Sequence, residues 1–184
     1  MPSDLVERAQ HGDHEAFDAL AAGAYDRLYA IARRILRDSY AADDAVQDAL
    51  IRAWRDLASL RDTDRFDAWL HRLLVHACQD AGRRSRRRAV EVPVLEMDAL
   101  GTGDDFASVV ERDELERAFR HLSVEHRAVL VLTHYVGLPA QEVAEVLGIP
   151  PGTVYSRLHY GLRTMRALLV SPASVPVALP EHIR

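Results

Sequence analysis

The chain has 184 residues, of which 48% are hydrophobic and 28% charged, and its formal net charge is −5. This composition is typical of a globular protein and excludes a disordered tail. No apolar run approaches the ~20 residues that cross a bilayer, and no basic start precedes an apolar stretch at the N-terminus. We therefore expect a cytoplasmic protein without membrane insertion. Cys78 is the single cysteine, so no internal disulfide can form.

The first half of the chain, residues 4–88, is predicted to be helical almost throughout. Between residues 17 and 36, apolar residues recur at the intervals of an amphipathic helix. Asp38 then interrupts the periodicity and offers an N-cap for the next helix. Two further apolar stripes span residues 46–57 (Val46, Leu50, Ala53, Leu57) and 66–77 (Phe66, Leu70, Leu73, Ala77). No strand pattern is found, which predicts an all-α bundle.

The helix predicted around residues 43–54 has a mixed outer face. A solvated surface would account for its acids and its glutamine, whereas the β-branched apolar Ile51 among them suggests a docking surface. The residues alone leave these two interpretations balanced. The outward side chains are Asp44, Gln47, Asp48, Ile51 and Arg55.

Aromatic and cationic side chains share one face of the helix predicted from residue 66. Such a face suits opened or single-stranded DNA, because bases stack on rings while phosphates pair with arginine. For Trp69, core packing is the alternative and the better supported one on sequence alone. The members of this face are Arg65, Trp69, Arg72, His76 and Arg83.

Charge is distributed in blocks along the middle of the chain. Five arginines fall between residues 83 and 88, and nine acids against one arginine fall between residues 91 and 116. Residues 89–110 contain proline, glycines and acids without helical periodicity, which predicts a flexible acidic linker. Separate blocks of opposite charge suggest separate functions along the chain.

Two helices separated by a tight turn are predicted in the second half. Pro139 suits the first position of the first helix, and Gly148 suits a turn that requires a positive φ. Ala144 permits close helix approach, and Val154 faces back from the second helix. This spacing predicts a helix-turn-helix. Ser123 is an expected N-cap further upstream.

The last helix, predicted from about residue 152 to 169, has two distinct faces. Its expected buried stripe is Val154, Leu158, Gly161, Met165 and Leu169. The outward side chains suit phosphates and base edges in a major groove better than they suit a solvated surface. They are Tyr155, Ser156, Arg157, His159, Tyr160, Arg163 and Arg166.

Three segments together resemble the extracytoplasmic-function (group IV) sigma factors of bacterial RNA polymerase. They are AADDAVQDALIRAW, FDAWLHRLLVHACQDAGRR and LSVEHRAVLVLTHYVGLPAQEVAEVLGIPPGTVYSRLHYGLR. The resemblance implies two small helical domains, region two in residues 1–88 and region four in 111–169. A flexible acidic linker, 89–110, joins them, and a mobile tail follows over 170–184.

The resemblance implies a promoter-specificity subunit that binds core RNA polymerase and helps to open promoter DNA, with no catalytic residue, cofactor or metal. The implied polymerase contacts are Asp44, Gln47, Asp48 and Ile51 on the β′ clamp helices, with the β flap as a second docking site. The −10 element would be read by Arg61, Asp62, Arg65, Trp69, Arg72, His76, Arg83 and Arg84. The −35 element would be read by Tyr155, Ser156, Arg157, His159, Tyr160 and Arg163. An anti-sigma factor is a further implied partner.

The chain departs from the family pattern at two of these positions. His76 stands where asparagine is common, and Tyr155 stands where lysine or arginine is frequent. The alternative function is a stand-alone helix-turn-helix regulator whose helical first domain senses a ligand or dimerises. That alternative predicts an enclosed apolar pocket or a dimer seam in residues 1–88. The nine histidines show no familiar metal-ligand spacing, which argues against a metal-dependent enzyme.

Overall fold

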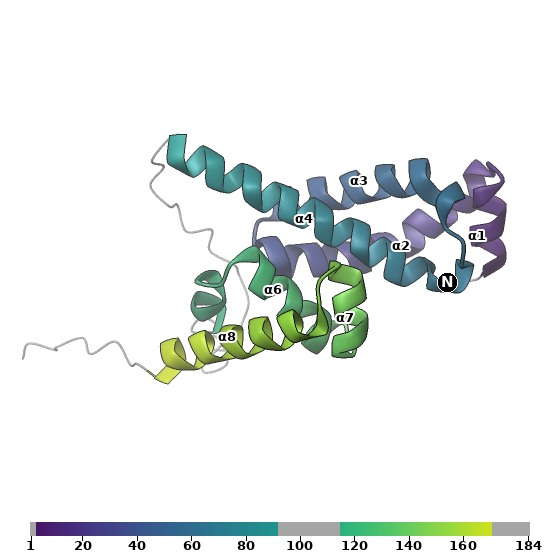
Figure 1. The fold of residues 1–184 in the computed structure, drawn as a ribbon. Helices are drawn as coiled ribbons and strands as arrows, with labels where there is room; N and C mark the ends of the chain where they lie inside the picture. The colour runs from purple at the N-terminus through teal and green to yellow at the C-terminus, as the bar shows by residue number, and fades with distance from the viewer. Residues whose placement is uncertain (1–2, 92–114, 171–184) are drawn as a thin grey trace, which may run out of the picture.

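The computed structural model describes residues 3–91 and 115–170, and helices dominate both ranges (Figure 1). Within these ranges no strand is present, so the predicted all-α class is confirmed. No helix of the described chain has the length and apolar character needed to cross a membrane. The predicted linker and tail lie outside the described residues, apart from the ends of the helices that flank them.

The first module is a bundle in which α2, α3 and α4 pack on one another and α1 packs on α2. Asp13 caps α2 by accepting a hydrogen bond from the backbone N–H of Ala16 (3.0 Å). Asp38 caps α3 in the same way through Ala41 (2.9 Å), as the sequence predicts. The helices are α1 (Ser3–Gln10), α2 (His14–Leu36), α3 (Ser39–Asp56) and α4 (Phe66–Glu91).

Two short 3₁₀ turns, η1 (Leu57–Ser59) and η2 (Thr63–Arg65), connect α3 to α4. The side-chain amide of Gln10 donates to the carbonyl oxygens of Leu57 (3.1 Å) and Leu60 (2.6 Å). Ser3 Oγ donates to the Asp64 carboxylate (2.8 Å). The connecting loop is therefore fastened to α1, which fixes where α4 begins.

The second module starts with helical residues 115–120 and ends with the helix-turn-helix. Ser123 caps α6 (Val124–Leu130) by accepting from the N–H of His126 (3.4 Å), as predicted. Gly148 ends α7 (Ala140–Leu147) with φ 64°, also as predicted. The prediction for Pro139 was wrong by one position: its extended backbone (ψ 152°) makes it the N-cap, and α7 begins at Ala140. The last helix is α8 (Pro151–Val170).

A π-helical turn, η3 (Val131–Tyr135), continues α6 and was not predicted. The N–H of Val136 donates to the carbonyl of Val131, and that of Leu138 donates to Leu132 (both 3.0 Å). These wider hydrogen bonds rotate the end of the helix relative to a regular α-helix. Val131 and Leu132 are buried, while Tyr135 is 48% exposed.

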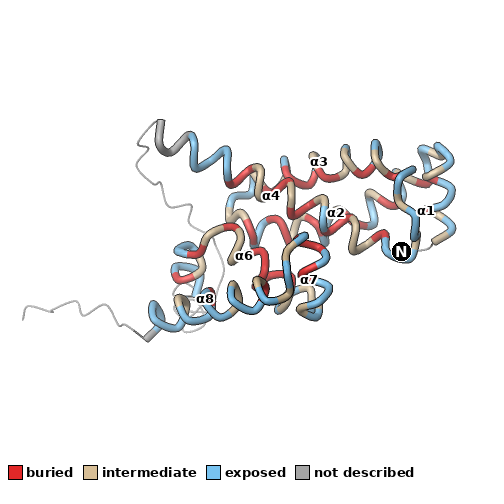
Figure 2. Tube along the Cα trace, in the orientation of Figure 1, coloured by how far each residue is buried: buried red, intermediate tan, exposed pale blue. Residues whose placement is uncertain are grey.

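The core follows the predicted stripes closely, with corrections at their edges (Figure 2). Val154 and Gly161 of α8 are buried, but Leu158 and Met165 are half-buried and Leu169 is 39% exposed. The end of α8 extends past the helices that cover its first turns, so the predicted stripe loses its cover there. Leu50 and Leu73 are likewise half-buried instead of buried.

The two modules pack against each other, a contact that the sequence did not predict. The second module lies on α2 and α4 through α6, η3 and α7, and one apolar core runs through both modules. At Gly82 of α4 the approach is so close that an added Cβ would lie 2.7 Å from Cγ2 of Val124. Arg86 also pairs with Glu125 (3.1 Å) across this contact. The division into two helical modules holds, but they share an interface.

Candidate docking and nucleic-acid surfaces

The outer side of α3 forms an exposed row that we call the α3 docking face: Tyr40, Asp44, Gln47 and Ile51. These positions are separated by three or four residues and so share one side of the helix. Ile51 is 64% exposed and Tyr40 is 83% exposed. Sequence reasoning missed Tyr40, although it stands one helical turn before Asp44. Exposed apolar and aromatic groups among acids favour a docking surface over a merely solvated one.

Polar contacts hold the acids beside this face. Gln47 donates from its amide to the Asp43 carboxylate (2.9 Å), and the Tyr25 hydroxyl donates to the other oxygen of that carboxylate. The bond to Asp43 raises the pKa of Tyr25. Asp48 is half-buried, with its carboxylate 3.7 Å from the Arg84 guanidinium. Asp48 therefore joins the α3 docking face to α4, whereas Asp44 is fully accessible.

An aromatic cluster at the end of α3 was also missed by sequence reasoning. Trp54 is 37% exposed, and its ring centroid lies 4.5 Å from that of His14 and 4.9 Å from that of Phe17. Both partners come from the start of α2. The cluster fixes the far end of α3 against α2 and leaves part of the tryptophan exposed.

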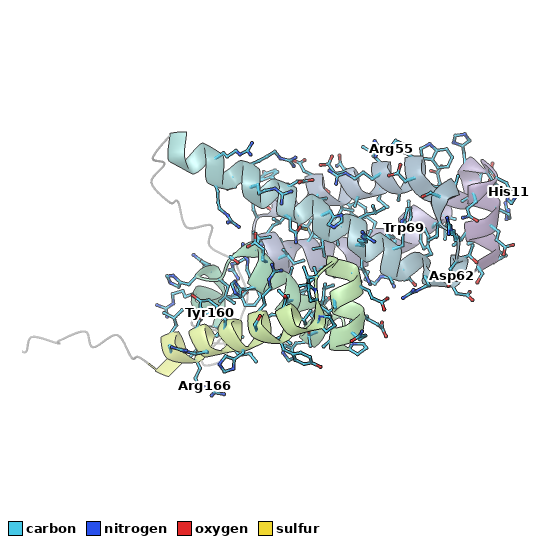
Figure 3. All side chains as sticks on the ribbon, viewed as in Figure 1. His11, Arg55, Asp62, Trp69, Tyr160 and Arg166 are labelled. Carbon is cyan, nitrogen blue, oxygen red and sulfur yellow. The ribbon has the colours of Figure 1, made fainter. Side chains whose placement is uncertain are left out.

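The predicted row on α4 is exposed along most of its length. Together with Arg84 and the loop residues Arg61 and Asp62, we call it the α4 face: Arg65, Trp69, Arg72, His76 and Arg83 are its other members. Arg72, Arg83 and Arg84 are exposed, and Trp69 is half-buried. The Trp69 ring packs at the edge of the core, 6.0 Å from the Phe66 ring, near the start of α4 (Figure 3). Trp69 thus combines the two alternatives: its body packs while an edge meets solvent.

His76 and the arginines near it form the middle of the α4 face. Burial lowers the pKa of His76, and Arg72 lowers it further, so the ring is neutral near pH 7. Asp80 accepts from Arg52 (3.0 Å) and from Arg83, and these bonds lower its pKa. Asp80 therefore holds Arg83 in place and offsets part of the positive charge.

The start of the α4 face includes the loop before the helix. Arg61 and Asp62 are both exposed. The Asp62 carboxylate accepts from the N–H of Asp64 (3.1 Å), which gives it a structural role as the cap of η2. Arg65 pairs with Glu145 of α7, so one predicted DNA contact is engaged by the second module.

The outer side of α8, which we call the α8 face, carries the exposed residues Tyr155, Ser156, His159, Tyr160 and Arg163. Arg157 is half-buried. Tyr155 and Tyr160 are 62% and 57% exposed. The Ser156 hydroxyl donates to the carbonyl of Thr153 (3.0 Å), so its lone pairs remain available as acceptors. Figure 3 shows Arg166 on the outer side of α8, whereas the Tyr160 ring lies toward α6, with its centroid 4.7 Å from that of His126.

The structure brings two of the predicted sites together and separates the third. The α3 docking face and the α4 face adjoin on the first module, linked by Asp48 and Arg84. The α8 face lies on the far side of the second module, with α6 and α7 between α4 and α8 (Figure 1). The α4 face and the α8 face, the two candidate nucleic-acid surfaces, therefore do not form one continuous surface in this arrangement.

Family models match both modules of the chain in order. The model of sigma-70 region 2 matches residues 20–88, and that of sigma-70 region 4 matches residues 112–165. The chain is 38% identical over 157 residues to the ECF RNA polymerase sigma factor SigM of Mycobacterium tuberculosis, covering 84% of this chain and 79% of that protein. It is 36% identical to SigL of the same organism, covering 82% and 89%.

Solved structures share the fold. The structure of CnrH in complex with the cytosolic domain of CnrY matches with a TM-score of 0.65 and 28% identity, covering 91% of this chain and 96% of that chain. The sigma factor RpoE of Bartonella quintana, solved with the anti-sigma factor NepR, matches with a TM-score of 0.67 at 22% identity, covering 83% and 96%. The latter likeness concerns the fold alone.

The alternative of a stand-alone helix-turn-helix regulator is not favoured, because the first module matches sigma-70 region 2 and not a sensor domain. Both modules of the chain and relatives that align over most of their length agree on one assignment. The chain belongs to the extracytoplasmic-function RNA polymerase sigma factors of the sigma-70 family.

Proposed function

We propose that this sigma factor docks on core RNA polymerase through the α3 docking face, reads the −10 element with the α4 face and reads the −35 element with the α8 face. The observation that carries this proposal is the separate exposure of three chemically different faces. No chemical step is assigned to the chain, which acts as a non-catalytic subunit.

The α3 docking face is the proposed contact with the clamp helices of the β′ subunit. Asp44 and Gln47 offer polar contacts around Ile51, and Tyr40 adds a large amphipathic ring. A central apolar group surrounded by polar ones is the usual arrangement of a protein interface. The second module is proposed to meet the β flap.

The α4 face is proposed to hold the opened strand of the −10 element. Unstacking a base costs a few kcal/mol, and stacking on an aromatic ring together with phosphate pairing offsets it. Trp69 supplies the exposed ring edge, and Arg72, Arg83 and Arg84 supply the cations. The neutral His76 ring can donate or accept a hydrogen bond where the family commonly has asparagine.

The α8 face is proposed to enter the major groove of the −35 element. Arg163 and Arg157 suit phosphates or guanine, and Ser156 and His159 suit base edges. Tyr155 lies at the N-terminal end of this face, 62% exposed, and offers its hydroxyl where a cation is frequent in the family.

Promoter binding requires the two modules to separate. Elements centred 25 base pairs apart lie about 85 Å apart at about 3.4 Å per base pair. Helices packed at about 8–10 Å put α4 and α8, with α7 between them, about 20 Å apart. The packed arrangement therefore corresponds to a sigma factor away from its promoter.

An anti-sigma factor is the proposed partner of the packed arrangement. A cavity of about 550 Å³ opens between α2 and the second module, with an apolar floor that includes Leu130, Leu162 and Met165. Arg33, Arg34 and Arg37 line one side of it. Apolar and cationic walls together suit an amphipathic helix with acidic residues.

Core association and promoter-dependent transcription in vitro test the proposed function. Asp44→Arg reverses a charge on the α3 docking face and is expected to weaken core binding at least tenfold, while the folded state is preserved. Asp18→Arg, on an exposed position of α2, is the matched control and should bind as the unchanged chain does. Equal core affinity of both variants would remove the α3 docking face from the proposal.

A further inference from the structure

A second cavity, of about 420 Å³, lies between the two modules. One wall comes from the end of α2 and the start of α3, and a second comes from α4 at Ala81, Gly82, Ser85 and Arg86. The third wall comes from the second module, over residues 120–124 and Arg127. Both modules are needed to form it, and neither the α4 face nor the α8 face contributes to it.

The charged groups that line this cavity are mostly cations. Among the described residues of its wall are the cations Arg86, Arg120 and Arg127, one carboxylate, Asp38, and the ionisable ring of His121. Asp38 is already engaged as the N-cap of α3. Arg86 pairs with Glu125 at 3.1 Å, so this acid is also occupied.

Arg127 is the cation of this wall that has a buried nitrogen without a partner. Its Nε atom is fully buried and has no hydrogen-bond partner, and among the described residues it forms no ion pair. Burial, followed by repulsion from Arg37, lowers the pKa of Arg127 to about 10, and the nearby Glu125 carboxylate offsets only part of this shift. A partly buried cation among other cations is costly unless an anion pairs with it.

We propose that this cavity binds a small phosphate-bearing anion, with Arg127 and Arg86 as its principal ligands. Planar guanidinium groups pair with phosphate oxygens in a bidentate way. A multiply charged anion can therefore neutralise several arginines at once, which a chloride ion cannot do. A cavity of 420 Å³ is large enough for a pyrophosphate group with water. The inference does not depend on the proposed promoter function.

Such an anion would bind only the packed arrangement. Arg86 belongs to α4 and Arg127 belongs to α6, so separation of the modules would divide the site. A ligand that binds one of two states stabilises that state by mass action. Anion binding and module separation are therefore opposed.

Titration calorimetry on the full chain in a chloride buffer tests the proposal, with sodium pyrophosphate as the probe and sodium chloride balancing ionic strength. One saturable site is expected. Arg127→Gln should weaken binding at least tenfold, which is the scale of a charged hydrogen bond. Arg87→Gln is the control, because this exposed arginine lies next to Arg86 on the helix but outside the cavity wall.

Two further measurements keep the result decisive. Arg86→Gln removes a cation from the opposite wall and should also weaken pyrophosphate binding. This variant replaces Arg127→Gln as the test if circular dichroism shows that Arg127→Gln is unfolded. Absence of saturable binding, or equal affinity in Arg127→Gln and the unchanged chain, would overturn the proposal. Displacement of pyrophosphate by a single-stranded oligonucleotide at matched phosphate concentration would also overturn it, by assigning the arginines to nucleic acid.

Discussion

Gly82 lies at a close approach between the modules, and replacing it with alanine should open that contact. An alanine Cβ would lie 2.7 Å from Cγ2 of Val124, whereas carbon atoms in contact prefer about 3.5–4.0 Å. The overlap is therefore about 1 Å. Val124 is itself 6% exposed and packs in the shared core, and its β-branched side chain has few alternative rotamers with which to relieve the overlap.

The substitution acts differently on the packed and the separated arrangement of the modules. Overpacking of about this size costs roughly 1–3 kcal/mol, and this cost arises only while the modules are packed. Alanine also stabilises a helix by about 1 kcal/mol relative to glycine, and α4 gains this in both states. The equilibrium between packed and separated modules should thus shift about 5-fold to 150-fold toward separation, although α4 itself becomes more stable.

Energy transfer between dyes on two introduced cysteines measures this equilibrium. His11→Cys and Arg166→Cys place the dyes on exposed positions of different modules (Figure 3). The native Cys78 is buried, and burial raises its pKa to about 12, so it should not react with the label. Gly82→Ala should lower the transfer efficiency, and adding Val124→Ala should restore it by removing the obstructing methyl group.

A matched glycine separates crowding from helix propensity. An added Cβ at Gly152 of α8 would meet no atom within 4 Å, so Gly152→Ala should strengthen its helix without changing the transfer efficiency. The reasoning is refuted if Gly82→Ala leaves the efficiency unchanged, or if the Gly82→Ala effect persists in full with Val124→Ala.

Three further predictions concern stability and DNA binding. Ser123→Ala removes the cap of α6 and should lower the free energy of unfolding by about 1 kcal/mol, seen as a lower urea midpoint at unchanged slope. Burial, and then Arg27, lowers the pKa of His71 below its ordinary 6.5. Because the folded state then disfavours the protonated ring, the free energy of unfolding should be highest above pH 6.5 and should fall below it, by up to about 1.4 kcal/mol per pH unit. His71→Leu should flatten that pH profile in urea titrations, and a profile that keeps its slope would refute the assignment. Arg163→Gln should reduce the salt slope of −35 binding by about one while core affinity stays unchanged, and a loss of core affinity would count against the α8 face.

Local chemistry explains which parts of the structure could be predicted from the sequence. The caps at Asp38 and Ser123 and the left-handed Gly148 were predictable because each depends on one side chain and its immediate backbone. The exposure of the arginines on α4 followed from helical periodicity alone. Tyr40 was missed because the outer row of α3 was counted from Asp44, although the same spacing extends backward to it.

Contacts between distant segments account for what could not be predicted. Nothing in the sequence around Gly82 or Val124 distinguishes a module interface from an ordinary helix, since one is a lone glycine and the other an apolar residue in the first turn. The lowered pKa of Arg127 is similarly invisible, because it arises first from burial and then from Arg37, which is remote in sequence. Periodicity predicts faces, but it does not say which faces meet.

The order of events in promoter binding follows from what the packed arrangement leaves open. The α3 docking face is not covered by the second module, so under the proposed function core polymerase could bind before the modules part. Arg65, by contrast, is held by Glu145, and the spacing of the two promoter elements requires separation. The Arg65–Glu145 and Arg86–Glu125 pairs are largely exposed, and such pairs contribute only about 0–1 kcal/mol each and weaken with salt. The shared apolar core along α6, η3 and α7 therefore contributes more to the interface than these two pairs, and under the proposed function the binding energy from polymerase must mainly overcome that apolar contact before DNA is read.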